Sequence, residues 1–525
     1  MRHVWHPQAD RSEPRPRYAR LHPRSLPRTH RTSHRPGLRP HRSASCGGSR
    51  LQSRRGCPNG GSPNGRRPVC RGRYRMIRAL NVYLYDTHVA TITRRGENLQ
   101  LRYLPEYVES DTPVPISVTL PVVSPPFGND ETKRFLDNLM PDRADVRSRW
   151  ARQAKLTSDS TFDLLSVYGA DVAGALEFYP AGTSPRQEEN LTPLTDREIG
   201  DRIRQIRRDD SDWLQHRAVE EGFSLGGAQG KFALTLRDNQ WFEPSGRQPS
   251  THIFKPGIQP LPGSDVTEHI TLQVARLLGI DTAASVIAEF DGEHVLIVER
   301  FDRFEDNGAI SRIHQEDLAQ ATGTSHVQKY ESDGGPGYRD IFTVFDRNLS
   351  AADARTAKER FAKLHVFSWI IGHNDGHSKN YSLTHVPGRS VLAPFYDLNS
   401  SLPFTQREQV LAHEPAVFDD VELAFAVDGA NTLGTFNGDS IRRLEADAGL
   451  AEGYLRDFAL QVAAGLQPAV AVVTEAIPDR LNELPSVALY PHATYTQTLR
   501  VFDALSAISH SGALLEGTAA RPRRL

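Results

Sequence analysis

From residue 76 to its last residue, the 525-residue chain contains no cysteine, since Cys46, Cys57 and Cys70 all precede that point. This absence excludes a disulfide, a thiolate nucleophile and a cysteine-ligated metal site from the folded part of the chain. It agrees with a reducing compartment, and we expect the protein to be cytoplasmic. Long apolar runs are also lacking after residue 76, so the sequence predicts no membrane span and no membrane partner.

Residues 1–75 lack lysine and carry only two acids, Asp10 and Glu13, against 19 arginines. Ten prolines and the absence of apolar periodicity leave too little apolar surface to offset the entropy of folding this segment. We therefore expect a disordered basic segment. It could be an arm that contacts nucleic acid or a targeting peptide without the usual apolar stretch. We favour a third interpretation, in which translation begins at Met76 and residues 1–75 are upstream sequence.

The most informative motif is Asp375-Gly-His-Ser-Lys-Asn380, followed seventeen residues later by Asp397. An acid and an amide five positions apart, then a second acid beyond a short hairpin, is the spacing of protein kinases. There the first Asp acts as the base toward a hydroxyl nucleophile, while the Asn and the later Asp bind magnesium on the nucleotide phosphates. The alternative is a solvated polar loop, which fits each carboxylate alone better than it fits all three residues together.

The sequence around this motif predicts a geometry that would bring its parts together. Apolar residues recur at helical spacing over 361–371, so a buried helix should end near Gly372. Two short strands, 381–383 and 391–393, flank the turn at Pro387-Gly388. A hairpin of this kind would return Asp397 to the side of Asn380.

Upstream, residues 223–231 read Phe-Ser-Leu-Gly-Gly-Ala-Gln-Gly-Lys and precede a predicted strand at 231–236. A glycine-rich turn beside a strand can cover nucleotide phosphates with backbone N–H groups, although many hairpins and linkers are also glycine-rich. Lys255 ends a second predicted strand and would contact phosphate, or else is an edge lysine kept for solubility. Glu268, taken as the start of the next helix, would pair with Lys255 or be an ordinary acid in a first helical turn.

The apolar strand 295–298 is followed by Glu299-Arg300-Phe301, which would form the hinge of a two-lobed kinase or simply a charged strand end. Elsewhere the pattern predicts two short strands over 80–93 with a turn near Asp86-Thr87, and further strands at 116–123 and 174–179. It also predicts helices at 132–139, 144–154, 162–168, 454–466 and 499–508, and a charged linker at 204–212.

In this order the motifs resemble the HipA family of bacterial serine/threonine kinase toxins. The strings that carry the resemblance are Phe135–Asp142, Phe162–Leu165, Ser224–Gln229, Thr251–Lys255, Val298–Arg303, His314–Asp317, Tyr330–Gly337, Asp375–Asn380 and Pro394–Asp397. They cover about residues 77–510, and residues 1–75 have no counterpart. One departure is Gly230, where the family usually has an acidic residue before the lysine. This departure puts the closure of the loop over a nucleotide in doubt.

The resemblance implies an ATP- and Mg²⁺-dependent protein kinase with Asp375 as the catalytic base and with Asn380 and Asp397 as metal ligands. The nucleotide-binding residues that it implies are Gly226, Gly227, Ala228, Gln229, Gly230, Lys231, Lys255, Glu299, Arg300, Phe301, His377, Ser378, Lys379, Asn380, Tyr396 and Asp397. It also implies autophosphorylation of Ser224 in the glycine-rich segment. A phosphate there would repel the phosphates of ATP and switch the enzyme off.

The implied partners are a HipB-like helix-turn-helix antitoxin, operator DNA bound through the antitoxin complex, and a protein substrate such as glutamyl-tRNA synthetase. The implied fold is α+β, a divergent two-lobed protein-kinase-like fold. We expect a small N-terminal subdomain (76–180), an N-lobe (181–305), a mainly helical C-lobe (306–512) and a disordered tail (513–525).

Two other functions stay open at this stage. The chain could bind nucleotide as a co-repressor together with its antitoxin, without transferring phosphate, or it could phosphorylate a lipid or small molecule. The complete set Lys255, Asp375, Asn380 and Asp397 argues against a kinase that has lost activity.

Overall fold

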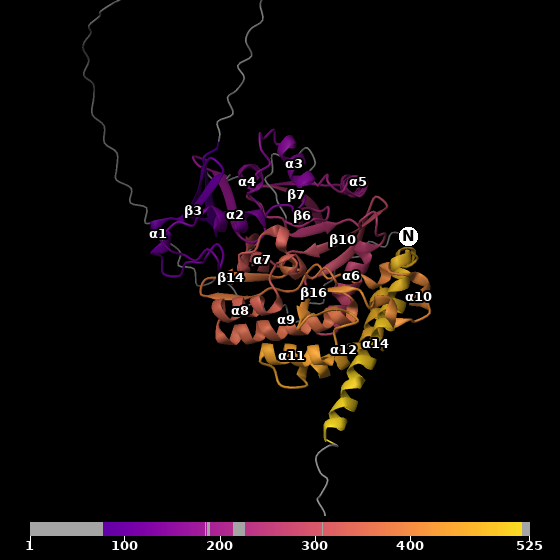
Figure 1. Ribbon diagram of the computed structural model, residues 1–525. Helices are drawn as coiled ribbons and strands as arrows, with labels where there is room; N and C mark the ends of the chain where they lie inside the picture. The colour runs from indigo at the N-terminus through magenta and orange to yellow at the C-terminus, as the bar shows by residue number, and fades with distance from the viewer. Residues whose placement is uncertain (1–76, 184, 186–188, 214–225, 307, 517–525) are drawn as a thin grey trace, which may run out of the picture. The chain divides into compact units, whose positions relative to one another are not determined.

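A computed structural model describes residues 77–183, 185, 189–213, 226–306 and 308–516 of the chain (Figure 1). The chain from Ile77 onward forms one compact unit. Most of its strands lie before residue 318, and its three longest helices lie after residue 350, as expected for the α+β class.

The first part of the chain builds an antiparallel sheet whose strand order is β3-β2-β1-β4. Its elements are β1 (Ala79–Leu84), β2 (Thr87–Arg95), β3 (Asn98–Tyr103), β4 (Leu176–Pro180), α1 (Pro105–Val108), α2 (Asn129–Asp137), α3 (Ala144–Gln153) and α4 (Thr161–Tyr168). Every second residue of β1 and β3 is buried, because alternate side chains of a strand point to opposite faces. Buried side chains of α2, α3 and α4 complete this core. We call residues 77–180 the N-terminal subdomain.

The expected strand at 116–123 is wrong. This stretch forms only an isolated bridge between Ser117 and Leu120, within a series of turns and bends. Pro115 and Pro121 flank the bridge, and a proline has no N–H to contribute to a strand ladder. The apolar residues here are buried for packing and not as part of a sheet.

The second sheet has the strand order β5-β7-β6-β8-β10-β9. Its strands are β5 (Glu189–Pro193), β6 (Phe232–Arg237), β7 (Gln240–Gly246), β8 (His252–Lys255), β9 (Ser285–Phe290) and β10 (Glu293–Glu299), and the helices beside it are α5 (Asp196–Arg208) and α6 (Ser264–Leu277). Helix α6 begins at Ser264, so Glu268 lies inside the helix and not at its start.

Helix α5 replaces most of the charged linker that we expected at 204–212. A capping box between Thr195 and Glu198 starts the helix, and Ile199, Ile203 and Ile206 are buried at helical spacing against the second sheet. The abundance of charged residues on the exposed side of α5 hid this spacing in the sequence.

The remaining elements form a mainly helical part. They are β11 (Arg303–Asp306), β12 (Ala309–Arg312), β13 (His314–Asp317), α7 (Leu318–Thr322), α8 (Tyr338–Asn348), α9 (Ala351–Ile371), β14 (Ser382–Val386), β15 (Arg389–Leu392), α10 (Arg407–Leu411), β16 (Glu422–Val427), β17 (Ala430–Thr432), α11 (Gly438–Ala448), α12 (Tyr454–Glu475), α13 (Asp479–Asn482) and α14 (Pro485–Glu516). Helices α8, α9, α11 and α12 lie side by side (Figure 1). The first four residues of the expected disordered tail belong to α14.

The prediction that no segment is apolar enough to span a membrane is wrong for one helix. By length and composition, α12 could do so, and 39% of its most apolar window is buried. Its residues Leu455, Val462, Leu466 and Val470 belong to the large core of the helical part. A core helix of this kind passes the same test of length and hydropathy.

A buried ion network joins the N-terminal subdomain to the strand end after β10. Asp171 of the subdomain accepts a 2.8 Å hydrogen bond from Arg303 and a 2.6 Å hydrogen bond from Ser250. Arg300 pairs with Asp302 at 2.9 Å and donates to the backbone oxygen of Val172 at 3.0 Å. Burial alone would raise the pKa of Asp171, but the neighbouring guanidinium groups lower it to about 2.

Replacing Asp171 with Ala should remove one of the two buried carboxylates that pair with Arg300 and Arg303, at a cost of about 3–5 kcal/mol in unfolding free energy. Denaturant unfolding at neutral pH measures the change. The exposed Asp201, which pairs with Arg204 on α5, provides the control, and Asp201→Ala should produce no measurable change. The low pKa of Asp171 means that its contribution is present above the ordinary carboxyl pKa of about 3.9. It is lost as the pH falls toward about 2. Equal unfolding free energies for wild type and Asp171→Ala would contradict the network.

Candidate active site

A cavity of about 780 Å³ lies where the second sheet, the N-terminal subdomain and the loop after α9 meet. Of the site residues predicted from the sequence, those that line it are Gly226, Gly227, Ala228, Gln229, Gly230, Lys231, Lys255, Glu299, Arg300, Phe301, Asp375, His377, Lys379, Asn380, Tyr396 and Asp397. Segments up to 171 positions apart in sequence, from Gly226 to Asp397, therefore converge on one space. We call it the main cavity.

The loop after α9 turns sharply at Gly372, which has a φ of 68°. A Cβ atom at this position would lie 2.4 Å from Leu402, so only glycine fits both the backbone and the packing. The loop then folds on itself, because the side-chain amide of Asn380 donates to the backbone oxygen of Asp375 at 2.6 Å. The chain thus fixes the two residues relative to each other.

Ser378 lies in this loop but not in the lining of the main cavity. It is fully buried and its hydroxyl donates to the backbone oxygen of Lys329 at 2.9 Å. This contact anchors the loop to the segment that carries Lys329 and Tyr330. A direct contact between Ser378 and a nucleotide stays a prediction. In the structure, Ser378 supports the position of the loop.

Asp375 has an accessible carboxylate, with 58% of its side chain exposed. The hydroxyl of Tyr330 donates to its Oδ1, and burial together with Asp375 raises the pKa of Tyr330, so that this hydroxyl stays protonated. His377 lies with Nε2 3.9 Å from the same oxygen, and burial lowers the pKa of His377 to about 4. At neutral pH, His377 is therefore uncharged, and Oδ2 of Asp375 is left to accept a proton.

Asp397 is held by Lys255, whose ammonium lies 2.6 Å from Oδ1 of Asp397 and 2.7 Å from Glu268. Of the two alternatives that the sequence left open for Glu268, the structure has the pairing with Lys255. Burial would raise the pKa of Asp397, but Lys255 and Lys231 lower it, so this carboxylate is ionised. Asp397 has a left-handed backbone with a φ of 58°, a strained conformation that gathers at functional sites.

The donor atoms suit a hard divalent cation that is shared with phosphate. Asn380 uses its side-chain nitrogen to donate to Asp375, which leaves its Oδ1 as a free acceptor. Asp397 uses Oδ1 toward Lys255, which leaves its Oδ2. Both residues line the main cavity. Over the described residues, no group of three or more His, Cys, Asp or Glu side chains could hold a metal alone, so ligand oxygens would complete the coordination.

The glycine-rich segment is packed closely at both ends. A Cβ atom on Gly226 would lie 2.8 Å from the backbone oxygen of Asn138, and one on Gly230 would lie 2.7 Å from Ile206 of α5. The packing against α5 gives the departure from the family at Gly230 a physical reason, because α5 leaves no room for a side chain. Ser224 lies outside the described residues.

Lys231 ends this segment inside the main cavity. Burial lowers its pKa, and the charge of the neighbouring Lys255 lowers it further, to about 8. Its ammonium also lies 5.8 Å from the centre of the ring of Trp213, which follows the end of α5 by five residues, and the sequence did not suggest this contact.

At the other end of the main cavity, the rings of Phe301 and Tyr396 stack with their centres 5.4 Å apart. The hydroxyl of Tyr396 contacts Ser382 at 2.7 Å and donates to the backbone oxygen of Lys379 at 3.0 Å. The side chain of Arg300 is fully engaged in the buried ion network described above. Arg300 can therefore offer a ligand its backbone more readily than its side chain.

Several lining or supporting residues were given no role by the sequence analysis. They are Asn138, Asp142, Arg143, Lys329 and Tyr330, and each lies in or beside the main cavity or contacts Asp375 or Lys379. The strings 135–142 and 330–337 contain three of them, Asn138, Asp142 and Tyr330. Those strings supported the family resemblance, but only their packing against distant segments shows what the residues do.

Both parts of the chain are similar to known proteins. Residues 80–179 match the family model for the HipA N-terminal domain, and residues 223–469 match that for the HipA-like C-terminal domain. The chain is 33% identical over 340 residues to "Putative kinase Y4mE" of Sinorhizobium fredii, covering 62% of this chain and 78% of that protein. It is 30% identical over 349 residues to the serine/threonine-protein kinase toxin HipA of Shewanella oneidensis, covering 63% of this chain and 77% of the relative.

Among solved structures, the fold is similar to that of a chain in the Shewanella oneidensis complex of HipA, HipB and operator DNA. The TM-score is 0.68 at 23% identity, and the match covers 82% of this chain and 99% of that chain. The chain belongs to the HipA family of serine/threonine kinase toxins, as the sequence motifs predicted, and it has the family's two-lobed fold.

Proposed function

We propose that this protein is a serine/threonine kinase that transfers the γ-phosphate of Mg²⁺-bound ATP to a hydroxyl group of a protein. The observation that carries the proposal is that Asp375 and Asp397 line two cavities at once. The main cavity would hold the nucleotide. A second cavity, of about 580 Å³, would admit the acceptor.

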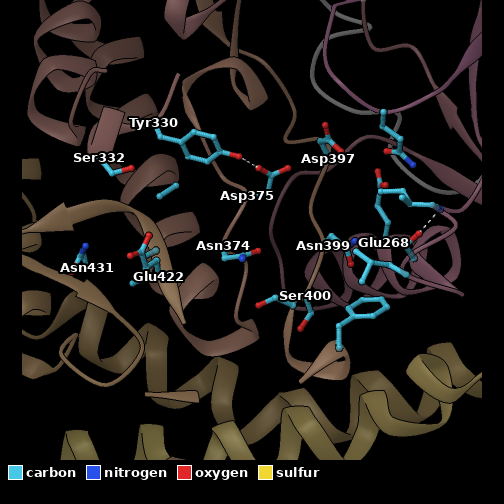
Figure 2. Close-up of a pocket in the computed structure, with 18 of the residues that line it drawn as sticks. Glu268, Tyr330, Ser332, Asn374, Asp375, Asp397, Asn399, Ser400, Glu422 and Asn431 are labelled. Atoms are coloured by element: carbon cyan, nitrogen blue, oxygen red, sulfur yellow. Dashed lines mark hydrogen bonds between the residues drawn. The ribbon is translucent and has the colours of Figure 1, made fainter. Parts of the chain in front are cut away.

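Figure 2 shows this second cavity, with Asp375 and Asp397 facing it and the hydroxyl of Tyr330 directed at Asp375. An acceptor in this cavity would contact Asp375, which also lines the nucleotide side. Phosphoryl transfer needs the attacking oxygen, the phosphorus and the leaving oxygen nearly in line, so a base between two cavities is well placed.

In the main cavity, the triphosphate of ATP would lie between the glycine-rich segment and the ammonium groups of Lys231, Lys255 and Lys379. The adenine ring of the nucleotide would lie near Phe301 and Tyr396, with backbone groups of 299–301 at its edge. Asn380 and Asp397 would hold Mg²⁺, which when bound offsets the negative charge of the phosphate oxygens. Asp375 would orient the acceptor hydroxyl and take its proton on Oδ2, while Tyr330 holds Oδ1 in place.

Autophosphorylation of Ser224 follows as part of the proposal. Ser224 is two residues from Gly226, which lines the main cavity, and two residues span at most about 7 Å. A phosphoserine at this position would bring its charge close to the triphosphate site and oppose ATP binding.

The proposed setting is cytoplasmic, with a HipB-like helix-turn-helix antitoxin that binds operator DNA together with this chain, and with glutamyl-tRNA synthetase as a candidate substrate. Support for the antitoxin and the DNA comes from the structural relative, whose crystal contained HipA, HipB and operator DNA. The competing function is a nucleotide-binding co-repressor that transfers no phosphate.

Removing the base should separate catalysis from binding. Asp375→Gln should slow phosphoryl transfer by about 10²–10⁴-fold, because a general base acts on the transition state, and should spare ATP affinity. The measurement uses labelled ATP with Mg²⁺, followed by peptide mapping, with label expected at Ser224 in wild type. Wild-type protein that binds ATP and stays unlabelled would favour the co-repressor.

The metal assignment has its own test. Asp397→Ala should weaken binding of Mg²⁺-ATP by about tenfold or more, equivalent to at least ~1.4 kcal/mol. Titration calorimetry measures this binding. ATP without Mg²⁺ serves as the control, and its affinity should not fall, because the lost carboxylate repels phosphate. An unchanged affinity for Mg²⁺-ATP would contradict the assignment.

The low pKa of Lys231 predicts a pH dependence. Since its ammonium loses its proton as the pH rises through about 8, the affinity of the free protein for ATP should fall above that pH. Lys231→Arg should remove this dependence, because a guanidinium stays charged throughout. Calorimetric titrations of both proteins on either side of pH 8 compare them, and identical pH profiles would exclude Lys231 as the cause.

A further inference from the structure

Asp142 links the N-terminal subdomain to two parts of the active site. It lies in the turn between α2 and α3, and its backbone N–H donates to the backbone oxygen of Gly227 at 3.0 Å. The preceding residue, Pro141, forms an isolated parallel bridge with Gly227. The subdomain therefore grips the glycine-rich segment through its backbone at this turn.

The side chain of Asp142 divides its two oxygens between two lysines. Oδ1 lies 2.6 Å from the ammonium of Lys379, and Oδ2 lies 3.2 Å from that of Lys329. Lys379 also donates to the backbone oxygen of Asn138 at 3.4 Å. Both lysines line the main cavity, whereas Asp142 lies behind them, outside its lining. The carboxylate of Asp142 thus positions the ammonium groups of Lys379 and Lys329 without itself facing the main cavity.

The carboxylate of Asp142 carries its charge throughout the neutral pH range, so it can hold the two lysines at all times. Burial alone would raise the pKa of Asp142, but the two ammonium groups lower it to about 2, so the carboxylate is ionised throughout the neutral range. Only 11% of its side chain is exposed, so water screens these pairs weakly.

The same arrangement occurs at Lys255, which also lines the main cavity. There Glu268 of α6 holds Lys255 at 2.7 Å. Each lysine is fixed by a carboxylate from a structural element that contributes no other group to the chemistry. Lys379 is adjacent to Asn380 and four residues from Asp375, so its place is tied to those of the metal ligand and the base.

We propose that Asp142 is a positioning residue for phosphoryl transfer, through which the N-terminal subdomain orients Lys379 and Lys329 and holds the glycine-rich segment at Gly227. This inference rests on the proposed kinase function. It makes the subdomain a part of the active site and not only a neighbour of it.

The test measures autophosphorylation at saturating Mg²⁺-ATP together with ATP affinity. Asp142→Asn keeps the shape of the side chain but loses its charge, so the lysines stay cationic and lose their fixed places. We expect the rate to fall on the order of 10- to 100-fold, the scale of a misplacement of about 1 Å. ATP affinity should stay within about threefold, since no cation is removed.

A matched control is Asp137→Asn. Asp137 belongs to the same subdomain and lies 3.8 Å from Arg147 in a partly buried pair, outside the main cavity. It should retain the wild-type rate. In a Lys379→Met background, Asp142→Asn should slow the reaction by much less than it does alone, because one of its two partners has gone.

The outcomes separate the two hypotheses. A wild-type protein that transfers no phosphate overturns the proposed function and this inference with it. An active wild type whose rate Asp142→Asn leaves unchanged, or lowers only in step with ATP affinity, overturns the inference alone. If Asp142→Asn does not fold, Asp142→Glu decides the question, since it keeps the charge but displaces the lysines by about one bond length, ~1.5 Å. A slower rate at unchanged affinity then supports the inference, and a wild-type rate overturns it.

Discussion

The ammonium of Lys255 is the point on which the rest of the site depends. Only 8% of its side chain is exposed, and two carboxylates, Asp397 and Glu268, lie within 2.7 Å of it. A buried ammonium is stable only when it is paired with good geometry. The cluster of Lys255, Glu268 and Asp397 draws these residues from β8, from α6 and from the loop after β15, in that order. This one cluster therefore holds the second sheet, the helix beside it and the proposed metal ligand Asp397 together. Burial and Asp397 raise the pKa of Glu268 to about 7 despite the nearby lysine, which shows how closely the charges are crowded.

The site separates groups that must be charged from groups that must not be. The carboxylates of Asp142 and Asp397 are kept ionised by lysines. His377, beside the proposed base, is kept neutral by burial, and Tyr330 is kept protonated. Neither a neutral imidazole nor a protonated phenol places a further charge beside Asp375, and the phenol holds Oδ1 by a hydrogen bond while Oδ2 faces the acceptor in the proposed reaction.

The sequence predicted the parts of this site that are local in the chain. The helix α9, the hairpin of β14 and β15, and the run from Asp375 to Asn380 could be read from periodicity and turn residues, because each depends on near neighbours. The pairing of Lys255 with Glu268 could be named only as one of two alternatives, since it joins segments thirteen residues apart. The roles of Asp142 and Tyr330 were missed, because their partners lie 237 and 45 residues away. Prolines defeated the predicted strand at 116–123, and the charged face of α5 hid its buried isoleucines.

The buried network of Asp171, Arg300, Asp302 and Arg303 bears on how such chains can diversify. Because these charges are shared across the joint, an N-terminal subdomain taken from a relative would have to arrive with matching counter-charges. Recombination at the boundary near residue 180 would otherwise leave charged groups buried without a partner of opposite charge. We therefore expect the N-terminal subdomain and the rest of the chain to be inherited together, and substitutions in the network on one side of the joint to be accompanied by compensating substitutions on the other.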